Sequence, residues 1–344
     1  MRSLVTIQEI LDLEPIPGAD FIELATVMGW KAIVKKGEYQ VGDRCVYFEV
    51  DSFLPVEERF EFLRKGSYRN NEFMGPGFRI RTQKLRGCIS QGLIMPLDVD
   101  EQLEGLEIGT DVTELLGVRK WELPEIEFGH SKDNGDFSLG PKPYGIPTTD
   151  ELRVQSYGYL RTELIGKPYY ITTKMDGTSM TVYHKDGEVG VCSRKLNLID
   201  TGDSPYWSCA RRYGLPDSLK ELGRNLAIQG EFCGAGIQKN RLRLTIPKYY
   251  VFDVVDLDTG TYYGLEEIRQ LVEKLNLDMV PVEEEGESFQ YTQDELLEKA
   301  KGVYPSGLQK EGIVVRPLVP QICERGGHRL SFKTLNNNYL LKED

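Results

Sequence analysis

A lysine, an aspartate and a glycine lie close together in the stretch YYITTKMDGTSMTVY, residues 169–183. The five residues before Lys174 are β-branched or aromatic, so they predict a strand that ends at the lysine. A lysine amine is a nucleophile only when it is neutral, and its reference pKa is ~10.4, so positive charge or burial has to lower that pKa. A divalent cation beside the amine would do this, and Asp176 is placed to help hold a hydrated cation.

The same letters also have a purely structural explanation. Asp176-Gly177 is a favoured turn for a β-hairpin, in which Lys174 would be an ordinary solvated charge. Spacing alone leaves both interpretations open. The full string K-x-D-G-x-S at residues 174–179, together with matching stretches downstream, favours the chemical one.

This string resembles motif I of the covalent nucleotidyltransferases, which include ATP- and NAD-dependent nucleic-acid ligases and mRNA capping enzymes. The resemblance implies that Lys174 attacks the α-phosphate of a nucleotide and holds the nucleoside monophosphate as a phosphoramidate. It implies that Thr173 and Gly177 contact the nucleotide, the glycine by letting the backbone approach the ligand closely.

About twenty residues earlier, TTDELRVQ at 148–155 resembles an element that RNA ligases carry before the nucleophile. The resemblance implies that Glu151 and Arg153 contact the nucleotide, and a guanidinium fits phosphate oxygens well. A helix that begins with Thr149 or Asp150 as its N-cap explains the same letters, and both interpretations stay open here.

Two stretches after the lysine resemble further nucleotide-contacting motifs. VCSRKLNL at 191–198 resembles motif Ia, and implies that Arg194 reaches ribose or nucleic-acid phosphate. YYVFDVVD at 249–256 resembles motif IIIa, in which an aromatic ring stacks on adenine. Phe252 is the candidate for that ring, although a buried core strand would give the same sequence.

Two acidic residues belong to stretches that resemble motifs III and IV. They are Glu231, within residues 227–242, and Glu311, at the start of EGIVVRP. The resemblance implies that these carboxylates and Asp176 are ligands or water-holders of a cation. Oxygen-only ligands suit Mg²⁺ or Mn²⁺ better than zinc.

LSFKTLN at 330–336 resembles motif V, whose usual form is K-x-K, with Ser331 at the first lysine position. Lys333 is therefore the predicted contact to the α-phosphate. Whether Lys333 acts alone or another cation such as Arg329 assists stays open. The predicted catalytic residues are thus Lys174, Asp176, Glu231, Glu311 and Lys333.

Residues 1–120 contain short strands separated by tight turns, which predicts a small barrel. The stretch from Ile16 to Pro55 resembles an OB-fold, and is similar to the N-terminal domain of ATP-dependent RNA ligases of the Deinococcus/Naegleria type. DNA ligases and capping enzymes usually carry their OB domain after motif V. The order found here therefore favours the RNA-ligase branch.

Four cations lie close together in FRIRTQKLRG, residues 78–87. In a strand, Arg79 and Arg81 share one face, and Lys84 and Arg86 extend this basic edge. A solvated outer face would also explain them. Because the net charge of the chain is −12, a local cluster of cations favours a contact with a nucleic-acid backbone.

Composition narrows the remaining possibilities. The six cysteines include no C-x-x-C pair, so buried free thiols are expected rather than a zinc site or disulfides. No long apolar run and no signal-peptide layout is present, which predicts an intracellular, cytoplasmic protein, with a nuclear location not excluded. Residues 121–147 are rich in Gly, Pro, Ser and acids, and are predicted to link the OB domain to a nucleotidyltransferase domain at 148–344.

The sequence thus predicts an α+β protein, with an N-terminal OB-like β-barrel followed by a nucleotidyltransferase domain of ATP-grasp-like antiparallel sheets with helices. The resemblance implies an ATP-dependent RNA ligase that seals 3′-OH and 5′-phosphate ends, as in nick repair, through a lysyl-AMP intermediate. Its partners would be ATP, Mg²⁺ or Mn²⁺, and RNA, with a nicked duplex as the expected form and no obligate protein partner. The alternatives are a GTP-using capping-type guanylyltransferase and a non-catalytic OB-fold RNA-binding protein.

Overall fold

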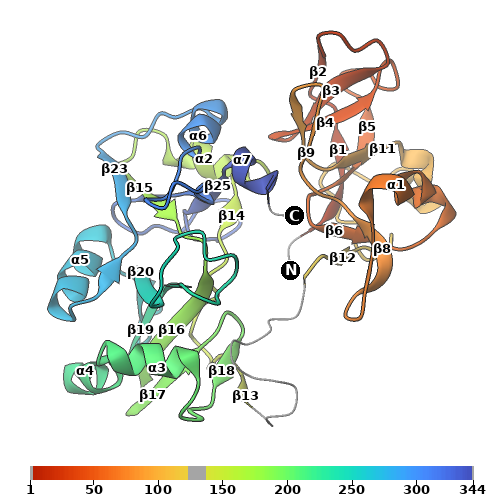
Figure 1. Ribbon diagram of the computed structural model, residues 1–344. Helices are drawn as coiled ribbons and strands as arrows, with labels where there is room; N and C mark the ends of the chain where they lie inside the picture. The colour runs from red at the N-terminus through yellow and green to blue at the C-terminus, as the bar shows by residue number, and fades with distance from the viewer. Residues whose placement is uncertain (1–2, 123–136, 343–344) are drawn as a thin grey trace. The chain divides into compact units, whose positions relative to one another are not determined.

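The computed structural model describes residues 3–122 and 137–342. The chain divides into two compact units, one comprising residues 1–125 with 340–344, the other residues 126–339 (Figure 1). Much of the predicted linker, residues 123–136, lies outside the described residues. Each unit is described by itself.

The first unit is built mainly from antiparallel strands arranged in small sheets. Its sheets have the strand orders β1-β5-β11, β2-β3-β4, β12-β6-β8-β7 and β10-β9. Those strands are β1 Val5–Glu9, β2 Asp12–Pro15, β3 Ile22–Val27, β4 Trp30–Lys35, β5 Arg44–Phe48, β6 Ser52–Leu54, β7 Tyr68–Asn71, β8 Gly75–Arg79, β9 Gln83–Leu85, β10 Cys88–Ser90, β11 Leu93–Met95 and β12 Arg119–Lys120. Short helical segments complete it, at Glu58–Leu63, Arg64–Ser67 (α1), Leu97–Val99 and Glu101–Leu103.

Strand β5 shows why this unit has a continuous interior. Its successive side chains point to opposite faces, and both faces are buried. Val46 and Phe48 pack into one apolar cluster, whereas Cys45 and Tyr47 pack into another. One strand therefore joins the two cores of the unit.

The second unit contains two larger sheets. One has the order β13-β18-β17-β16-β19-β20-β21, with β22 also paired to β20, and the other has the order β14-β25-β24-β15-β23. The strands of the first are β13 Ser138–Pro141, β16 Thr178–Lys185, β17 Glu188–Cys192, β18 Leu196–Leu198, β19 Leu226–Cys233, β20 Lys248–Asp256, β21 Thr261–Tyr262 and β22 Asp278–Met279. The second is formed by β14 Leu152–Arg153, β15 Tyr169–Lys174, β23 Val282–Gly286, β24 Gly312–Pro317 and β25 Phe332–Leu335.

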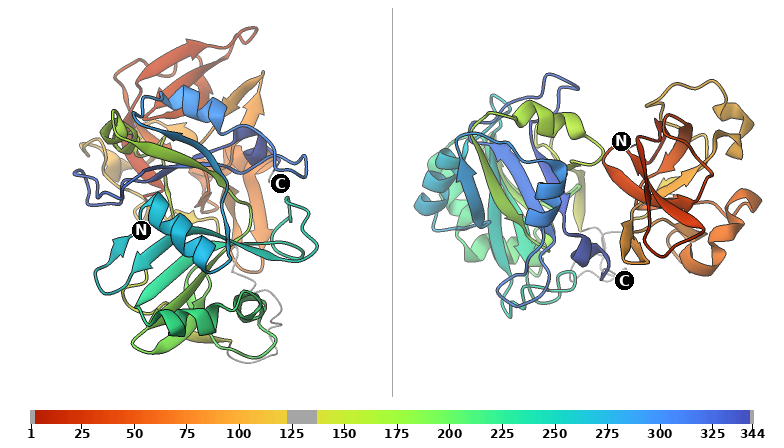
Figure 2. Two further views of the ribbon diagram at one scale, coloured as in Figure 1. Left: turned by 90° about the vertical axis from the view of Figure 1, so that its left-hand side faces the viewer. Right: turned by 90° about the horizontal axis from the view of Figure 1, so that it is seen from above.

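Helices cover the outer face of each sheet. In the larger sheet, side chains of α3, α4 and α5 share a core with β16, β19 and β20; in the smaller one, α2 and α6 pack on β15, β24 and β25 (Figures 1 and 2). The helices are α2 Gly158–Leu164, α3 Pro205–Arg212, α4 Leu215–Leu222, α5 Leu265–Lys274, α6 Gln293–Lys299 and α7 Asn337–Leu340. Helix α6 begins with a capping box, in which Thr292 and Glu295 satisfy each other's backbone donors.

With the outer faces buried, polar side chains remain on the faces that the two sheets turn toward each other. On β15 and β24, Ile171, Ile313 and Val315 enter the helix-covered core. Their neighbours in sequence, such as Lys174 and Arg316, point to the other side because side chains alternate along a strand. The active-site candidates therefore lie between two sheets that the helices support from outside.

Part of the predicted linker belongs to the second unit. Strand β13 pairs antiparallel with β18 and forms the edge of the larger sheet. Its residues lack an apolar period, so the sequence pattern gave no strand signal. Backbone pairing at a sheet edge needs no such pattern, which explains the difference.

The cysteines agree with the expectation from their spacing. All six are free thiols, and five of them are buried. Across the two described ranges, no helix is both long enough and apolar enough to cross a membrane.

Candidate active site

The nucleophile candidate lies where β15 and β24 end side by side. Lys174 is the last residue of β15 and pairs with Gly312, the first residue of β24. Lys174 Nζ donates to Glu311 Oε2 at 2.8 Å. The hairpin interpretation of Asp176-Gly177 is wrong, because β15 pairs with β23 and β24, whereas β16 pairs with β17 and β19. Lys174 thus lies at the end of a strand of the smaller sheet, and the chain that follows it enters the larger sheet.

The charge around this amine is strongly negative. Burial by itself lowers the pKa of Lys174, but the carboxylates of Glu311, Glu231 and Asp176 outweigh it, so the pKa is raised above its ordinary value. The amine is therefore an ammonium ion paired with Glu311 in this structure. To act as a nucleophile it needs the carboxylates to be compensated by another cation.

Two further carboxyl groups show the same excess of negative charge. Burial raises the pKa of Glu231 to about 8, Lys174 opposes this, and Glu311 and Asp176 add to it. Burial and Glu311 likewise raise the pKa of Asp176, although Tyr339 and Arg241 oppose the shift. The carboxyl groups of Asp176, Glu231 and Glu311 thus lie close to one another and to Lys174.

Asp176 is held by neighbours that the sequence did not indicate. Tyr339 donates its hydroxyl to Asp176 Oδ1 at 2.9 Å, and Arg241 Nε lies 3.4 Å from Oδ2. The Arg241 guanidinium also stacks over the Tyr339 ring, 4.4 Å from its centroid. These contacts fix the direction of the carboxylate.

Gly177 is needed for a close approach, but the approach is to β19. A Cβ on Gly177 would lie 2.5 Å from the Phe232 carbonyl oxygen and 2.7 Å from Cys233 Sγ. No side chain fits there, so Gly177 lets the segment after Lys174 lie directly against the strand that carries Glu231. Its predicted contact with the nucleotide stays a prediction.

A cationic group lies opposite the acids. Strand β14 runs parallel to β25, with Arg153 beside Lys333. Burial, Lys174 and Arg153 together lower the pKa of Lys333 to about 7. Because Lys174, Arg153 and Lys333 lie close enough to repel one another, a bound anion would stabilise their charged forms, and a phosphate group would supply one. The helix interpretation of TTDELRVQ is wrong, because residues 148–151 have no regular secondary structure and Leu152–Arg153 form β14.

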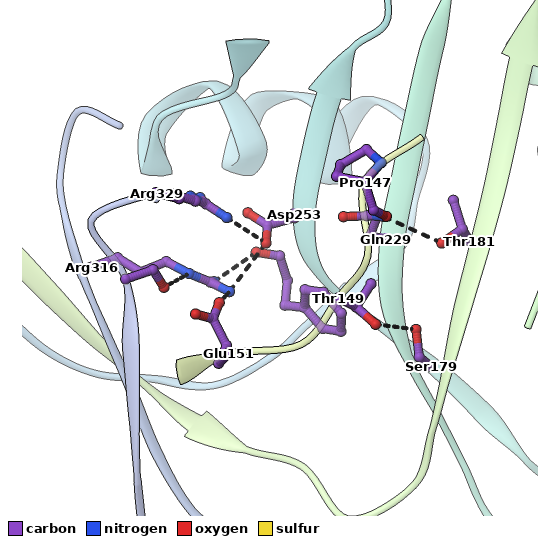
Figure 3. Close-up of polar contacts among 11 residues, drawn as sticks. Pro147, Thr149, Glu151, Ser179, Thr181, Gln229, Asp253, Arg316 and Arg329 are labelled. Atoms are coloured by element: carbon purple, nitrogen blue, oxygen red, sulfur yellow. Dashed lines mark hydrogen bonds and ion pairs between the residues drawn. The ribbon is translucent and has the colours of Figure 1, made fainter. Parts of the chain in front are cut away.

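Glu151 belongs to a buried ion-pair network rather than to this cationic group (Figure 3). Arg316 donates to Glu151 at 2.6 Å and to Asp253 at 3.1 Å, and it also donates to the Phe252 carbonyl oxygen at 3.0 Å. Arg329 donates to the same Asp253 carboxylate at 2.7 Å. Because Arg316 comes from β24 and Asp253 from β20, the network ties the two sheets together.

Ser331 is part of this network. Its hydroxyl accepts from Arg316 Nε at 3.1 Å, and the residue is buried. Arg329 engages Asp253 and stacks over the Tyr262 ring, 3.8 Å from its centroid. In this arrangement both arginines belong to the inter-sheet network, whereas Lys333 lies on β25, among the cations near Lys174.

Phe252 reaches its position through an irregularity in β20. Gln229 pairs with Asp253 but the next residue, Gly230, pairs with Val251, so Phe252 is an extra residue in a β-bulge. Phe252 packs against the apolar cluster that contains Met175, the residue after Lys174. Its ring is partly exposed, and the Arg316 guanidinium lies 6.0 Å from the ring centroid. Stacking of this ring on a base stays a prediction.

Other predicted residues are placed apart from this cluster. The Thr173 hydroxyl donates to Glu283 at 2.7 Å, so its side chain does not join that of Lys174. Arg194 forms an ion pair with Asp150 at 2.8 Å. In the first unit, Phe78 and Ile80 are buried and Lys84 and Arg86 are exposed, and Arg79 stacks over the Trp121 ring at 5.1 Å.

The donor set of the site fits a divalent cation held largely by water and phosphate. Within residues 3–122 and 137–342, no three His, Cys, Asp or Glu side chains form a ready-made metal cage. Yet Asp176 Oδ2 is buried without a hydrogen bond, and burial together with Glu311 and Asp176 raises the pKa of Glu231 despite the opposing charge of Lys174. Mg²⁺ typically binds one or two carboxylates plus substrate phosphates and keeps several waters. Asp176, Glu231 and Glu311 would hold such an ion.

Comparison with known proteins agrees with this geometry. An OB-fold domain model matches residues 4–97, and an RNA ligase model matches residues 167–335. No match is found among curated protein sequences.

Solved structures of Naegleria gruberi RNA ligase match along the whole chain. A mutant with ATP and Mn is 38% identical, with a TM-score of 0.90 over 98% of each chain. The same ligase with PPi has a TM-score of 0.89 at 38% identity over 99% of each chain, and a mutant with AMP and Mn has a TM-score of 0.90 at 38% identity over 99% of each chain. The predicted fold and the predicted enzyme class are confirmed: the chain belongs to the RNA ligase family, with an OB-fold domain ahead of its ligase domain.

Proposed function

We propose that this RNA ligase uses ATP and a divalent cation, and that AMP is carried on Lys174 between the steps. The observation that carries the proposal is the position of Lys174 Nζ, 2.8 Å from Glu311 Oε2. The raised pKa of Glu231 and the lowered pKa of Lys333 show acids and cations close to the same amine. Relatives solved with ATP, with AMP and with pyrophosphate support the choice of nucleotide.

In the first step the Lys174 lone pair attacks the α-phosphorus of ATP. The ammonium ion first gives up a proton to become a neutral amine. A nitrogen–phosphorus bond then forms, the bond from phosphorus to the pyrophosphate oxygen breaks, and the nitrogen loses a second proton, which leaves to solvent or with the pyrophosphate. Glu311 Oε2 lies within hydrogen-bond distance of that amine and can accept the first proton. Lys333 and Arg153 lie where they can compensate the charge of the phosphate.

In the later steps AMP passes from the lysine to a 5′-phosphate, and a 3′-OH then attacks the activated phosphate and expels AMP. A bound Mg²⁺ or Mn²⁺ supplies Lewis-acid neutralisation of the phosphate oxygens and lowers the pKa of the neighbouring amine. Asp176, Glu231 and Glu311 would hold such an ion, and Phe252 would stack on the adenine. Glu151, Arg153, Thr173, Gly177 and Arg194 are retained as proposed nucleotide-binding residues.

The substrate that we propose is RNA with 3′-OH and 5′-phosphate ends, as in a nicked duplex. The OB-fold domain, residues 1–120, would engage the nucleic acid, with residues 121–147 as the linker and 148–344 as the nucleotidyltransferase domain. A cytoplasmic location also remains a proposal from the sequence.

The direct test is incubation with α-labelled ATP and Mn²⁺, followed by a denaturing gel. Label should stay on the protein with α-labelled ATP and be absent with γ-labelled ATP, because pyrophosphate leaves. Label from GTP instead of ATP would indicate a capping-type guanylyltransferase. No label from either nucleotide would indicate an RNA-binding protein without this activity.

Cation binding should strengthen as the pH rises toward 8. The pKa of Glu231 is about 8, so below that pH its carboxyl is mostly neutral and a proton competes with the cation. We expect the Mn²⁺ concentration for half-maximal protein labelling to fall by up to about tenfold per pH unit between pH 7 and 8, and to level off above 8. Labelling of wild type and Glu231→Gln across pH 7–9 measures this.

Glu231→Gln removes the titrating group, so its Mn²⁺ requirement should be higher and nearly independent of pH. An equal Mn²⁺ requirement of the wild-type protein at pH 7 and pH 9 would contradict the assignment of Glu231 to the cation.

The exposed cations of the first unit should contribute to RNA binding. Each lost phosphate contact lowers the slope of log K against log salt by roughly 0.7 to 0.9. We expect Lys84→Ala/Arg86→Ala to weaken RNA binding and flatten its salt dependence, and a further loss when Arg79→Ala and Arg81→Ala are added. Titrations of labelled RNA at several salt concentrations measure both effects.

Lys35→Ala/Lys36→Ala is the matched control, since these two exposed lysines lie in the same unit and outside the predicted basic edge. The Lys84/Arg86 double variant is the decisive one, because Arg79 also pairs with Asp51 at 3.7 Å and its loss can disturb the fold. Equal slopes for the two double variants would show that Lys84 and Arg86 are ordinary solvated charges.

A further inference from the structure

A single tyrosine hydroxyl joins the backbones of the two residues at the centre of the site. Tyr304 donates its hydroxyl to the Lys174 carbonyl oxygen at 2.7 Å. The hydroxyl oxygen of Tyr304 in turn accepts the backbone N–H of Glu311 at 3.0 Å. None of the nucleotidyltransferase-like stretches in the sequence includes Tyr304.

The hydroxyl lies just past the point where the β-ladder ends. Strands β15 and β24 pair in register up to Lys174 and Gly312, the last matched residues of the ladder. Beyond that pair, the Glu311 N–H and the Lys174 C=O both bond to Tyr304 instead of to each other. Buried backbone groups need partners, so the phenol lets the strands separate here without leaving a donor and an acceptor unsatisfied.

Tyr304 is itself firmly held. Its backbone N–H bonds to the Leu308 carbonyl and its carbonyl accepts from Gly307, so it sits in a tight turn. Its side chain is only 3% exposed and packs with Met175, Cys233 and Val280. A ring that is fixed by a turn and by apolar packing can set the position of the groups it touches.

We propose that Tyr304 is a positioning residue for lysine adenylylation, which fixes the backbone of Lys174 relative to that of Glu311. This inference rests on the proposed role of Lys174 as nucleophile. Formation of the nitrogen–phosphorus bond requires the amine to lie in line with the departing pyrophosphate, and a misplacement of about 1 Å can cost 10²-fold in rate. Tyr304 itself touches neither the nucleotide nor the RNA in this scheme.

The role predicts a selective defect. Joining a pre-adenylylated strand forms a bond between a 3′-OH and a phosphate and expels AMP, and it does not use the lysine as nucleophile. A residue that positions Lys174 matters for the first reaction and much less for this one. A residue that only stabilises the fold would slow both reactions to a similar extent at temperatures near unfolding.

Tyr304→Phe is the informative change, because it removes both hydrogen bonds and keeps the ring. Tyr249→Phe is the matched control. Tyr249 is buried in the outer core of the larger sheet, and its hydroxyl donates to the Ile228 carbonyl at 2.8 Å and lies 3.2 Å from the Met180 carbonyl. Both variants lose one buried phenol hydroxyl with its backbone partners, but only one of them borders the site.

We expect Tyr304→Phe to slow single-turnover protein labelling at saturating ATP by about 10- to 100-fold. The ATP concentration for half-maximal labelling and the rate of joining a pre-adenylylated strand should each stay within roughly threefold of wild type. This is the pattern expected when a variant loses alignment in the transition state but still binds ATP normally. Tyr249→Phe should retain wild-type labelling, and thermal unfolding of both variants measures any general loss of stability.

Two results would overturn the inference. One is a labelling rate of Tyr304→Phe equal to that of Tyr249→Phe, and the other is an equal loss of labelling and of pre-adenylylated joining. Lys174→Met run in parallel separates this outcome from failure of the proposed function. If Lys174→Met is unlabelled while Tyr304→Phe labels normally, only the role of Tyr304 is lost, whereas a labelled Lys174→Met removes its premise.

Discussion

Lys174→Met should abolish formation of the protein–AMP adduct and the sealing of a nick that carries a 5′-phosphate. Methionine keeps much of the side-chain volume but has no amine to form the bond to phosphorus. Joining of a pre-adenylylated strand should largely survive, because that step needs no nucleophilic lysine. Labelling with α-labelled ATP and ligation of the two substrates measure these three outcomes.

Lys174→Arg is the matched variant for this test. Its guanidinium can still pair with Glu311, as the ammonium does at 2.8 Å in the wild-type chain, but an arginine is a cation at all accessible pH values. It should therefore fail in labelling as Lys174→Met does. If Lys174→Arg failed and Lys174→Met still became labelled, the nucleophile would have to be another residue.

The order of the motifs was enough to predict which distant residues meet. Glu231 and Glu311 lie 57 and 137 residues beyond Lys174 in the sequence (231 − 174 and 311 − 174), and in the structure both carboxylates raise the pKa of Lys174. The motifs contain the kinds of side chain that the proposed chemistry requires. For this reason the grouping of acids and cations around Lys174, including Lys333, could be predicted without knowing how the strands pair.

What the sequence could not predict depends on strand pairing and on packing. The bulge that turns Phe252 toward Met175 is visible only in the register of β19 against β20. Tyr304 lies in a stretch with no chemical signature, and its role follows from two hydrogen bonds to backbone atoms. A candidate for such a role would be a tyrosine next to a Gly-containing turn, shortly before motif IV, but many tyrosines satisfy that description.

Glu151 illustrates a different limit. The resemblance of TTDELRVQ implied a nucleotide contact, which stays a prediction, but it gave no sign of the ion pair that Glu151 forms with Arg316 at 2.6 Å. EGIVVRP gave no reason to single out its arginine. A buried arginine becomes interpretable only when the acids that surround it are known, since a buried charge has to be paired.

Arg316→Met should therefore produce the largest loss of stability among single changes in the second unit. Arg316 and Asp253 are each 3% exposed, and Arg316 also pairs with Glu151. Removing one partner of a buried pair leaves an uncompensated charge, at a cost of ~3–5 kcal/mol. For a unit of this size, about 1 kcal/mol shifts the unfolding midpoint by roughly 2–4 °C, so we expect a fall of roughly 6–20 °C. Thermal unfolding of the wild-type and variant proteins measures it.

Two controls make this prediction specific to buried charge. Arg269 pairs with Glu285 on the surface, where both side chains are well exposed, so Arg269→Met should cost less than ~1 kcal/mol. Asp253 keeps its ion pair with Arg329 at 2.7 Å in the Arg316→Met variant, whereas Glu151 loses its arginine partner. Adding Glu151→Gln to Arg316→Met removes this charge and should recover part of the lost stability, because a neutral group of similar shape carries a smaller burial cost. If Arg316→Met lowered the unfolding midpoint no more than Arg269→Met does, the network would not hold the two sheets together, and their arrangement would depend on apolar packing alone.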